Sequence, residues 1–352
     1  MSFGIATDEC RAADAAGWLT PAQQALIHQR DWLRMLAPRA CGGAELALPE
    51  LVRLEETIAQ QDGSMGWVVT LCAGAGWFAG FLAPGLARAI LATPNVCLAG
   101  SGAPTGYADR DGDGWRLVGR WDIASGAPMA THFTLNAVLR EHGTVLADDA
   151  GKPRIRAFVV PARHVTVEPT WRSIGLRASA SHAYRIDGAW VPADHAFTID
   201  PACATAPGPL YRFPFMPLAY VTLAANLLGM ARHFLALARA LLATRRHPSG
   251  VAMLEAPSAA ARLAAADAAV DAVRTRFYAR LDEAWAAALA HSAVDGAALQ
   301  AVALALVETC RTAVDTLYPF CGLQAAHGDS AINRVWRDFH TATQHALLLP
   351  ED

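Results

Sequence analysis

Four hydroxyl side chains between residues 105 and 181 have the type and setting to hold a planar ligand: Thr105, Ser125, Ser179 and Ser181. Hydroxyl groups both donate and accept hydrogen bonds. Gly106 permits a close approach of the backbone, and Trp121 could form one wall of an apolar slot. Together these residues predict a flat slot edged by a few polar groups. Taken singly, they also fit ordinary strand turns and core tryptophans, and both interpretations stay open.

A histidine near the end of the chain, His345, adds acid–base chemistry to this set. An imidazole titrates near neutral pH and can hold or move a proton. The position also falls near the end of a predicted helix, where a cation suits the helix dipole, so a structural interpretation remains beside the functional one. His340 lies five residues earlier and would face another side of that helix, which favours the structural interpretation for it.

Motifs for several other chemistries are missing from the sequence. The histidines and cysteines form no HExxH or CxxC pattern, so we expect no metal site. Gly102, Gly106 and Gly112 do not form a GxGxxG motif before a helix, which leaves a Rossmann nucleotide site unsupported. The chain also lacks GxSxG, the nucleophile motif of α/β-hydrolases.

Composition limits the partners and the compartment. Of the 352 residues, 29 are Lys or Arg and 32 are Asp or Glu, so no basic field draws nucleic acid. The seven cysteines are scattered, which is typical of a reducing cytoplasm. The most apolar stretch, 218–243, still contains charged residues, and the N-terminus lacks the pattern of a signal peptide. We therefore expect a cytoplasmic protein without a membrane span.

The order of the predicted elements narrows the fold. Residues 1–95 show helical patterns, with Pro21 and Pro49 at helix starts. Residues 96–205 show short strands separated by turns, which indicates a barrel or a sandwich, and we expect an antiparallel β-barrel. Residues 206–352 show four long helices, at about 218–246, 257–290, 296–320 and 330–348. The sequence thus predicts an α+β multi-domain protein with an N-terminal helical domain, a central β-barrel domain and a C-terminal four-helix bundle.

Five segments in this order give the chain a resemblance to the acyl-CoA dehydrogenase superfamily of flavoproteins. They cover the chain from about Leu36 to His345: Leu36–Gly43 with Glu55–Trp67, Ser101–Ala108, Gly119–Gly126, Trp171–Ser181 with Val191-Pro192, and Asn333–Asp338. Each motif is short and weak by itself, and their strength lies in the shared order. The resemblance implies a bound flavin, with cofactor contacts at Thr105, Gly106, Trp121, Ser125, Arg177, Ser179 and Ser181.

The dehydrogenase chemistry of that superfamily needs a carboxylate base, and this chain lacks one at both usual places. The position nine residues after Arg337 is Ala346, and the alternative position falls near Ala219. A methyl group cannot accept a proton. The segment Phe339–His345 instead resembles the end of the two-component, reduced-flavin-dependent monooxygenases (hydroxylases) of the same superfamily. By that resemblance His345 and Ser125 are the catalytic residues, with Ser125 at flavin N5.

The resemblance to these hydroxylases also implies cofactor and partners. They take reduced flavin from a separate flavin reductase, react it with O₂ and hydroxylate a small organic substrate, aromatic compounds included. Segment 247–257 lacks the Phe-Gly and Gln that help hold the ADP half of FAD, so we expect FMN to be preferred over FAD. We expect a homo-oligomer, a dimer or a homotetramer. Two alternatives remain: a dehydrogenase or oxidase with a relocated base, and a catalytically inactive oligomeric member.

Overall fold

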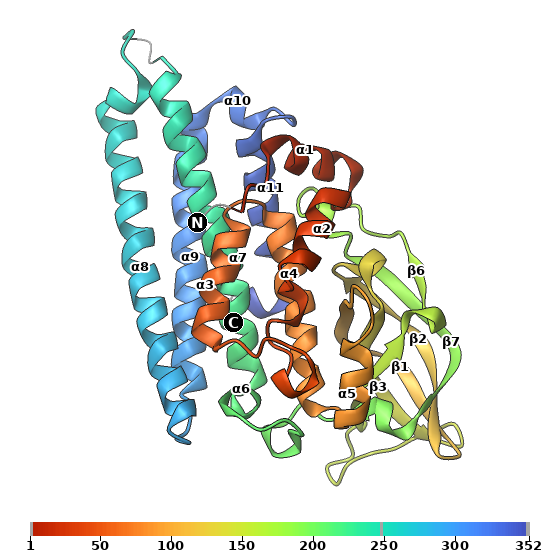
Figure 1. Ribbon diagram of the computed structural model, residues 1–352. Helices are drawn as coiled ribbons and strands as arrows, with labels where there is room; N and C mark the ends of the chain where they lie inside the picture. Colours follow the sequence, from red (N-terminus) through yellow and green to blue (C-terminus); the bar gives the residue numbers. More distant parts are fainter. Residues whose placement is uncertain (1–2, 247–248, 350–352) are drawn as a thin grey trace.

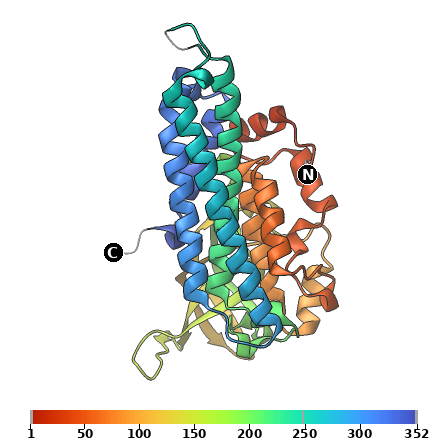
Figure 2. The ribbon, with the colours of Figure 1, turned by 90° about the vertical axis from the view of Figure 1, so that its left-hand side faces the viewer.

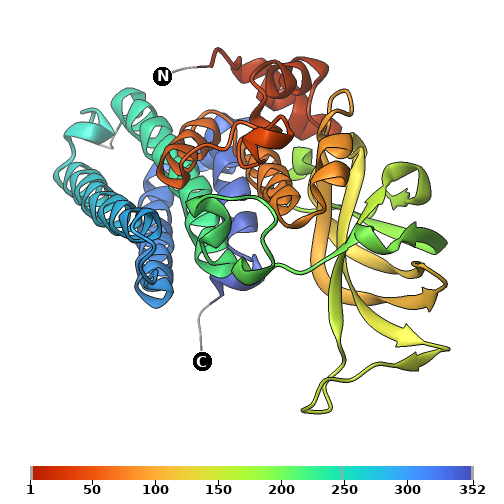
Figure 3. The same ribbon diagram turned by 60° about the horizontal axis from the view of Figure 1, so that its bottom comes forward.

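The computed structural model describes residues 3–246 and 249–349 and shows helices, then strands, then helices along the chain (Figure 1). The change from helix to sheet falls between Leu91 and Leu98, and the change back falls between Phe197 and Pro209. One continuous hydrophobic core runs through all three zones. Helix α4 (Gly63–Trp77) lies between the long C-terminal helices and the sheet and contacts both α7 (Phe215–Thr244) and β1 (Leu98–Asp111), while α3 (Leu48–Ala59) packs on α7 (Figure 3).

Two of the N-terminal helices, α2 (Pro21–Gln29) and α3 (Leu48–Ala59), start at the predicted prolines. Thr20 caps α2 with a capping box, because its hydroxyl accepts from Gln23 N while the Gln23 side chain accepts from Thr20 N. Asp62 caps α4 through a bond from Met65 N. The helices of this zone are α1 (Thr7–Ala16), α2 (Pro21–Gln29), α3 (Leu48–Ala59), α4 (Gly63–Trp77) and α5 (Pro84–Leu91).

The central strands form one mixed sheet, and this corrects the predicted antiparallel β-barrel. The order is β6-β7-β2-β1-β3-β5-β8 with β4 beside β3, and β1 pairs with β3 in parallel; a closed barrel is not seen among the described strands. The strands are β1 (Leu98–Asp111), β2 (Gly114–Ala124), β3 (His132–Glu141), β4 (Thr144–Val145), β5 (Ile155–Pro161), β6 (Thr166–Glu168), β7 (His182–Pro192) and β8 (Ala196–Phe197).

The parallel pair explains where Ser125 lies. A tight turn at Asp111–Gly114 makes β1 and β2 an antiparallel hairpin. The chain must then cross the start of β1 to reach its other edge, where Leu98 pairs with His132 of β3. Parallel pairing requires such a crossover. Ser125 is the first residue of the crossing segment, at the end of β2.

Three long helices of the C-terminal zone pack on one another and run side by side (Figure 2). They are α7 (Phe215–Thr244), α8 (Pro257–Leu289) and α9 (Gly296–Cys321), and α6 (Pro209–Arg212), α10 (Leu323–Ala326) and α11 (Ala331–Ala342) complete the zone. Helix α7 contacts α3, α4, α9 and α11, which accounts for its apolar character on nearly every side. These contacts make α7 the central helix of the zone.

Three described segments are long and apolar enough to cross a membrane by length and composition alone: Gly63–Phe81, α7 and α9. The apolar windows of the first two are 83% and 78% buried inside the protein. Only 39% of the window in α9 is buried, although α9 is as apolar as α7. Packing within the chain therefore explains the first two segments but leaves much of α9 uncovered.

The last predicted helix ends earlier than expected. The sequence pattern extends helix to 348, but α11 stops at Ala342, and a short turn, Ala346–Leu348, follows. His345 has extended backbone angles and caps this turn, since its Nδ1 accepts from Leu347 N at 3.3 Å. His345 is thus held outside the helix, and the expected helix-dipole role does not apply to it.

Two neighbouring carboxyl groups of α3, Glu55 and Glu56, are buried in contrasting ways. Glu56 accepts hydrogen bonds from Arg232 at 2.6 Å, from Arg274 at 2.8 Å and from the Tyr278 hydroxyl. These bonds tie α3 to α7 and α8, and they hold the pKa of Glu56 below its usual value despite burial, which alone would raise it. Glu55 is fully buried, and burial raises its pKa well above the usual value, while the nearby Thr70 hydroxyl offsets only part of that rise.

Candidate active site

A chain of hydrogen-bonded hydroxyl groups joins three of the predicted site residues. The Ser125 and Ser181 oxygens lie 2.8 Å apart, and the Ser181 and Ser179 oxygens lie 2.7 Å apart. Trp67 Nε1 donates to Ser125 Oγ at 3.2 Å, and Ser179 Oγ donates to the Leu176 carbonyl at 2.7 Å. The relative exposure falls from 5% at Ser125 to 2% at Ser181 and 0% at Ser179. The chain thus reaches inward from Ser125, its most accessible hydroxyl.

Trp67 also contacts His345, which places this histidine near Ser125. The Trp67 indole that donates to Ser125 also meets the His345 ring edge-on, with ring centroids 5.9 Å apart. Burial lowers the pKa of His345 from its ordinary value, so the ring is neutral at pH 7. Because Nδ1 accepts from Leu347 N, the neutral ring carries its proton on Nε2. His345 therefore presents an N–H donor beside Trp67.

Strained backbone surrounds these residues. Ile123, Leu176 and Ala180 have φ values of 64°, 50° and 42°, in the left-handed region. That region disfavours side chains, and a β-branched residue such as Ile123 is a rare occupant. Each such residue costs about 1–3 kcal/mol, and strain of this kind gathers at functional sites. All three lie within three positions of a serine in the hydroxyl chain, which marks this part of the sheet as a candidate active site.

Helix α11 contacts the turn that carries Ser179 and holds it in place. Asp338 Oδ1 accepts from Leu176 N at 2.6 Å, and Arg337 pairs with Asp14 of α1 at 2.7 Å and donates to the Ile174 carbonyl. Gly175 packs so tightly here that a Cβ atom would lie 2.0 Å from the Arg337 carbonyl oxygen. The Arg337-Asp338 pair of the predicted last-helix motif therefore positions the turn that carries Ser179.

The stability that Asp338 contributes at this contact depends on pH. Burial raises the pKa of Asp338 to about 8, and the nearby carboxyl of Asp62 adds to the rise. A carboxyl whose pKa is raised on folding contributes stability at low pH that is lost as pH rises from its unfolded pKa, about 3.9, to its folded pKa. Asp338→Asn keeps an acceptor for Leu176 N but does not titrate.

We therefore expect the Asp338→Asn variant to gain stability relative to the unchanged protein as pH rises from about 5 to about 8, by more than about 1 kcal/mol. Urea unfolding at the two pH values measures this difference. A stability difference that stays constant with pH would show that Asp338 is already ionised at the lower pH.

Two predicted cofactor contacts lie elsewhere on the sheet. The side chain of Thr105 is exposed on β1 and donates to the Arg120 carbonyl at 2.6 Å. Gly106 packs on the Trp121 ring, where an added Cβ would lie 2.1 Å from a ring carbon. Segment Ser101–Ala108 is part of strand β1, with an irregular register between Ser101 and Gly106. The structure does not join these residues to the hydroxyl chain.

Trp121 belongs to the core of the sheet. It is fully buried, stacks on Tyr184 with ring centroids 5.4 Å apart, and donates to the Asn136 carbonyl at 2.9 Å. A ring enclosed on all sides leaves no face for a ligand, so the expected cofactor wall is corrected to a packing role for Trp121. Arg177 is exposed on the same turn as Ser179, and its guanidinium group forms no ion pair with a described residue.

The sequence interpretation did not include Trp67 among the site residues. Trp67 and Ser125 are 58 positions apart, and no local spacing connects residues so distant. Cys72, one turn and a half further along α4, also reaches the site, where its Sγ donates to the Ser125 carbonyl. Helix α4 therefore supplies one side of the site.

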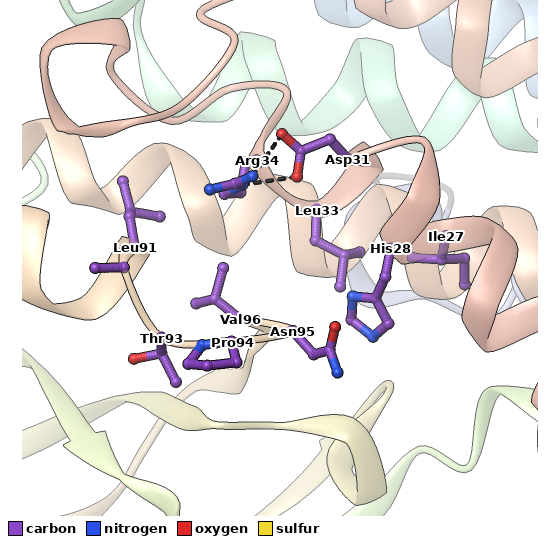
Figure 4. Close-up of a pocket in the computed structure, with 11 residues that line it drawn as sticks. Ile27, His28, Asp31, Leu33, Arg34, Leu91, Thr93, Pro94, Asn95 and Val96 are labelled. Carbon is purple, nitrogen blue, oxygen red and sulfur yellow. Dashed lines mark hydrogen bonds and ion pairs between the residues drawn. The ribbon is translucent and has the colours of Figure 1, made fainter.

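A cavity of about 250 Å³ lies between the N-terminal helices and the start of β1 (Figure 4). His28, Asn95 and the Asp31–Arg34 ion pair line it, with Arg34 held by two hydrogen bonds of 2.7 and 2.8 Å. A second depression of about 280 Å³ lies between α7 and the 324–332 segment. Neither contains Trp67, Ser125 or His345, so both are separate from the candidate active site.

Comparison with known proteins supports the superfamily resemblance. Residues 221–350 match the family model described as acyl-CoA dehydrogenase, C-terminal domain. A pigment production hydroxylase of a Rhodococcus species is 29% identical, with 90% of this chain and 82% of that protein covered. The oxygenase component of the FADH2-dependent resorcinol hydroxylase of a Rhizobium species is 27% identical, with 88% and 80% covered. XiaF of a Streptomyces species, solved with FADH2 and glycerol, has the same fold, with a TM-score of 0.88, 22% identity and 97% and 88% covered.

Proposed function

Because the chain has the acyl-CoA dehydrogenase-like fold over its length and the family's C-terminal domain at 221–350, we propose that it is the oxygenase component of a two-component, flavin-dependent monooxygenase. It takes reduced flavin from a separate reductase and uses O₂ to hydroxylate a small organic substrate. The hydroxylase names of its relatives favour this reaction over acyl-CoA dehydrogenation.

The observation that carries the proposal is the meeting of Ser125 and His345 at Trp67. The site offers a hydroxyl oxygen, a neutral imidazole with an N–H donor, and an indole between them, with no carboxylate in the cluster. A base that removes a proton next to a thioester is therefore missing, while groups that bind a polar flavin edge and stabilise negative charge on oxygen are present. Ala346, at the usual place of the base, is exposed on the final turn.

The site fits a reduced flavin in its chemistry. Ser125 provides a polar atom for N5 of the ring, and the exposed Ile123 beside it provides apolar surface. Arg177, exposed on the Ser179 turn, suits a flavin phosphate. The bound flavin supplies the reaction with O₂, while the residues of this chain position the ring, exclude water and donate hydrogen bonds.

We also propose FMN over FAD, on the sequence of segment 247–257, of which residues 247–248 lie outside the described part of the chain. Two relatives are named for FADH2, so the preference needs a direct comparison. Titration with each reduced flavin under anaerobic conditions gives it. Tighter binding of reduced FAD would overturn the preference without affecting the monooxygenase proposal.

The partners of the proposed enzyme are a flavin reductase and further copies of this chain in the cytoplasm. The low burial of α9, 39% of its apolar window, supports a dimer or homotetramer in which a second copy covers this helix. Light scattering on the purified protein tests the assembly. A monomer at micromolar concentration would contradict this part of the proposal.

The proposed reaction is tested by supplying the missing components. The protein, a generic flavin reductase, NADH, flavin and isotopically labelled dioxygen are incubated with a panel of phenols and other small aromatic compounds. We expect one compound to gain a single labelled oxygen atom, with the second oxygen atom released as water. Bleaching of tightly bound oxidised flavin by an acyl-CoA thioester would instead establish the dehydrogenase alternative.

A further inference from the structure

In the hydroxyl chain, the number of polar hydrogens equals the number of hydrogen-bond contacts. Its four contacts join Trp67 to Ser125, Ser125 to Ser181, Ser181 to Ser179, and Ser179 to the Leu176 carbonyl. The hydrogens are one on the indole nitrogen and one on each of three hydroxyls. Every contact needs one hydrogen between its two heavy atoms, so none is left over.

The two ends of the chain fix its direction. The indole nitrogen of Trp67 can only donate, and a carbonyl oxygen can only accept. The Leu176 oxygen already receives Ser179 N at 3.0 Å and Trp171 Nε1 at 2.9 Å besides the Ser179 hydroxyl. The hydrogens therefore point inward at each step, from Trp67 through Ser125, Ser181 and Ser179 to Leu176.

Ser125 Oγ, at the outer end of the hydroxyl chain, is therefore left as a hydrogen-bond acceptor. Ser125 Oγ receives the Trp67 hydrogen on one lone pair and gives its own hydrogen to Ser181. One lone pair remains, and only a donor can use it without breaking a bond in the chain. Reversing one hydroxyl would bring two oxygens to 2.7 or 2.8 Å with no hydrogen between them.

We infer that Ser179 and Ser181 are positioning residues that hold Ser125 Oγ as a hydrogen-bond acceptor and thereby make the site select reduced over oxidised flavin. Reduced flavin carries a hydrogen on N5 and donates there, whereas N5 of oxidised flavin is an acceptor. Two acceptors facing each other in a buried site lose a hydrogen bond and its desolvation energy. This inference rests on the proposed function, because it places the flavin N5 edge at Ser125.

The burial and contacts of Ser179 distinguish this directional role from a simple packing role. Ser179 is fully buried, and its hydroxyl connects to Ser125 Oγ only through Ser181; its backbone carbonyl accepts from Gly126 N at 2.9 Å, a bond that Ser179→Ala keeps. A packing role would make loss of Ser179 weaken both flavin states equally. A directional role makes the loss release the Ser181 hydrogen, which can turn toward Ser125 and free the Ser125 hydrogen to donate to N5 of oxidised flavin.

The test measures dissociation constants of reduced and oxidised FMN under anaerobic conditions for the unchanged protein and for Ser179→Ala and Ser181→Ala. Ser173→Ala is the matched control, since it removes a hydroxyl from the same loop that donates to Gly175 and takes no part in the chain. We expect the unchanged protein and the control to bind reduced FMN more tightly than oxidised FMN. In the two chain variants we expect this preference to shrink by about tenfold, the effect of roughly one buried hydrogen bond.

The outcomes separate this inference from the proposed function. An unchanged preference in both chain variants, with reduced FMN still bound, would overturn the directional role and leave the monooxygenase proposal standing. Failure of the unchanged protein to bind FMN or FAD in either state would overturn both. Thermal unfolding of each variant checks that the fold is kept, and Ser181→Ala provides a second reading if Ser179→Ala unfolds.

Discussion

In the His345→Ala variant, we expect formation of hydroxylated product to fall by about two to three orders of magnitude, while binding of reduced flavin changes little. That size is typical for loss of a single donor that stabilises charge on a reacting oxygen. His345 is neutral with its proton on Nε2, and it packs on Trp67 beside Ser125. Product yield per flavin oxidised, measured with a reductase present, checks this prediction.

His340→Ala is the matched control for that variant. His340 is also half-buried, but it lies on α11 and packs on Trp336, with Nε2 at 3.0 Å from Asp315. We expect it to leave the product yield within a factor of about three. Equal losses in the two variants would mean that His345 acts only through the stability of the C-terminal segment.

The second large effect concerns stability. Glu56→Gln is expected to lower the free energy of unfolding by about 2–3 kcal/mol, because it removes the charge that pairs with Arg232 and Arg274 and leaves the Tyr278 hydroxyl poorly matched. The estimate is below the range for fully buried pairs, since both arginines are about one-third exposed, at 34% and 37%. Urea unfolding at pH 7 gives the value.

Glu55→Gln, one position earlier on the same helix, should change the free energy of unfolding in the opposite direction. Glu55 has a raised pKa, so the stability it contributes at low pH is lost as pH rises above its unfolded value of about 4.3. Glu56 has a lowered pKa, so its contribution is present above that value and is lost as pH falls. At pH 7 the Glu55 variant should be at least as stable as the unchanged protein. A loss comparable to that of Glu56→Gln would show that the contact of Glu55 with Thr70 outweighs its burial.

Local sequence patterns predicted most elements of the fold. Thr20 and Pro21 mark a real helix start, and the change from helical to strand patterns falls where the structure changes. The parallel pairing of β1 with β3 was missed, because pairing between strands that are not consecutive leaves no local pattern. The end of α11 was missed for a related reason, since Ala342–Leu348 is rich in helix-forming residues and tertiary contacts decide where the helix stops.

The candidate site was predicted in part. The resemblance pointed to Ser125, Ser179, Ser181 and His345, and the structure brings all four together. It did not reveal Trp67, which joins them, because that contact spans distant parts of the chain. Trp121 was expected at the ligand, but Gly106 and Tyr184 enclose it in the sheet. Residue type alone cannot separate a core tryptophan from one at a cofactor.

Stopped-flow mixing of the protein and reduced flavin with O₂ tests the central claim most directly. If the chain is an oxygenase component, the site shields the bound flavin, and oxidised flavin should appear in a phase distinct from the reaction in free solution and slower than it. The Ser125→Ala variant should shift that phase toward the free-solution rate. Oxidised flavin that appears with free-solution kinetics in the unchanged protein, at concentrations where flavin is bound, would contradict the account.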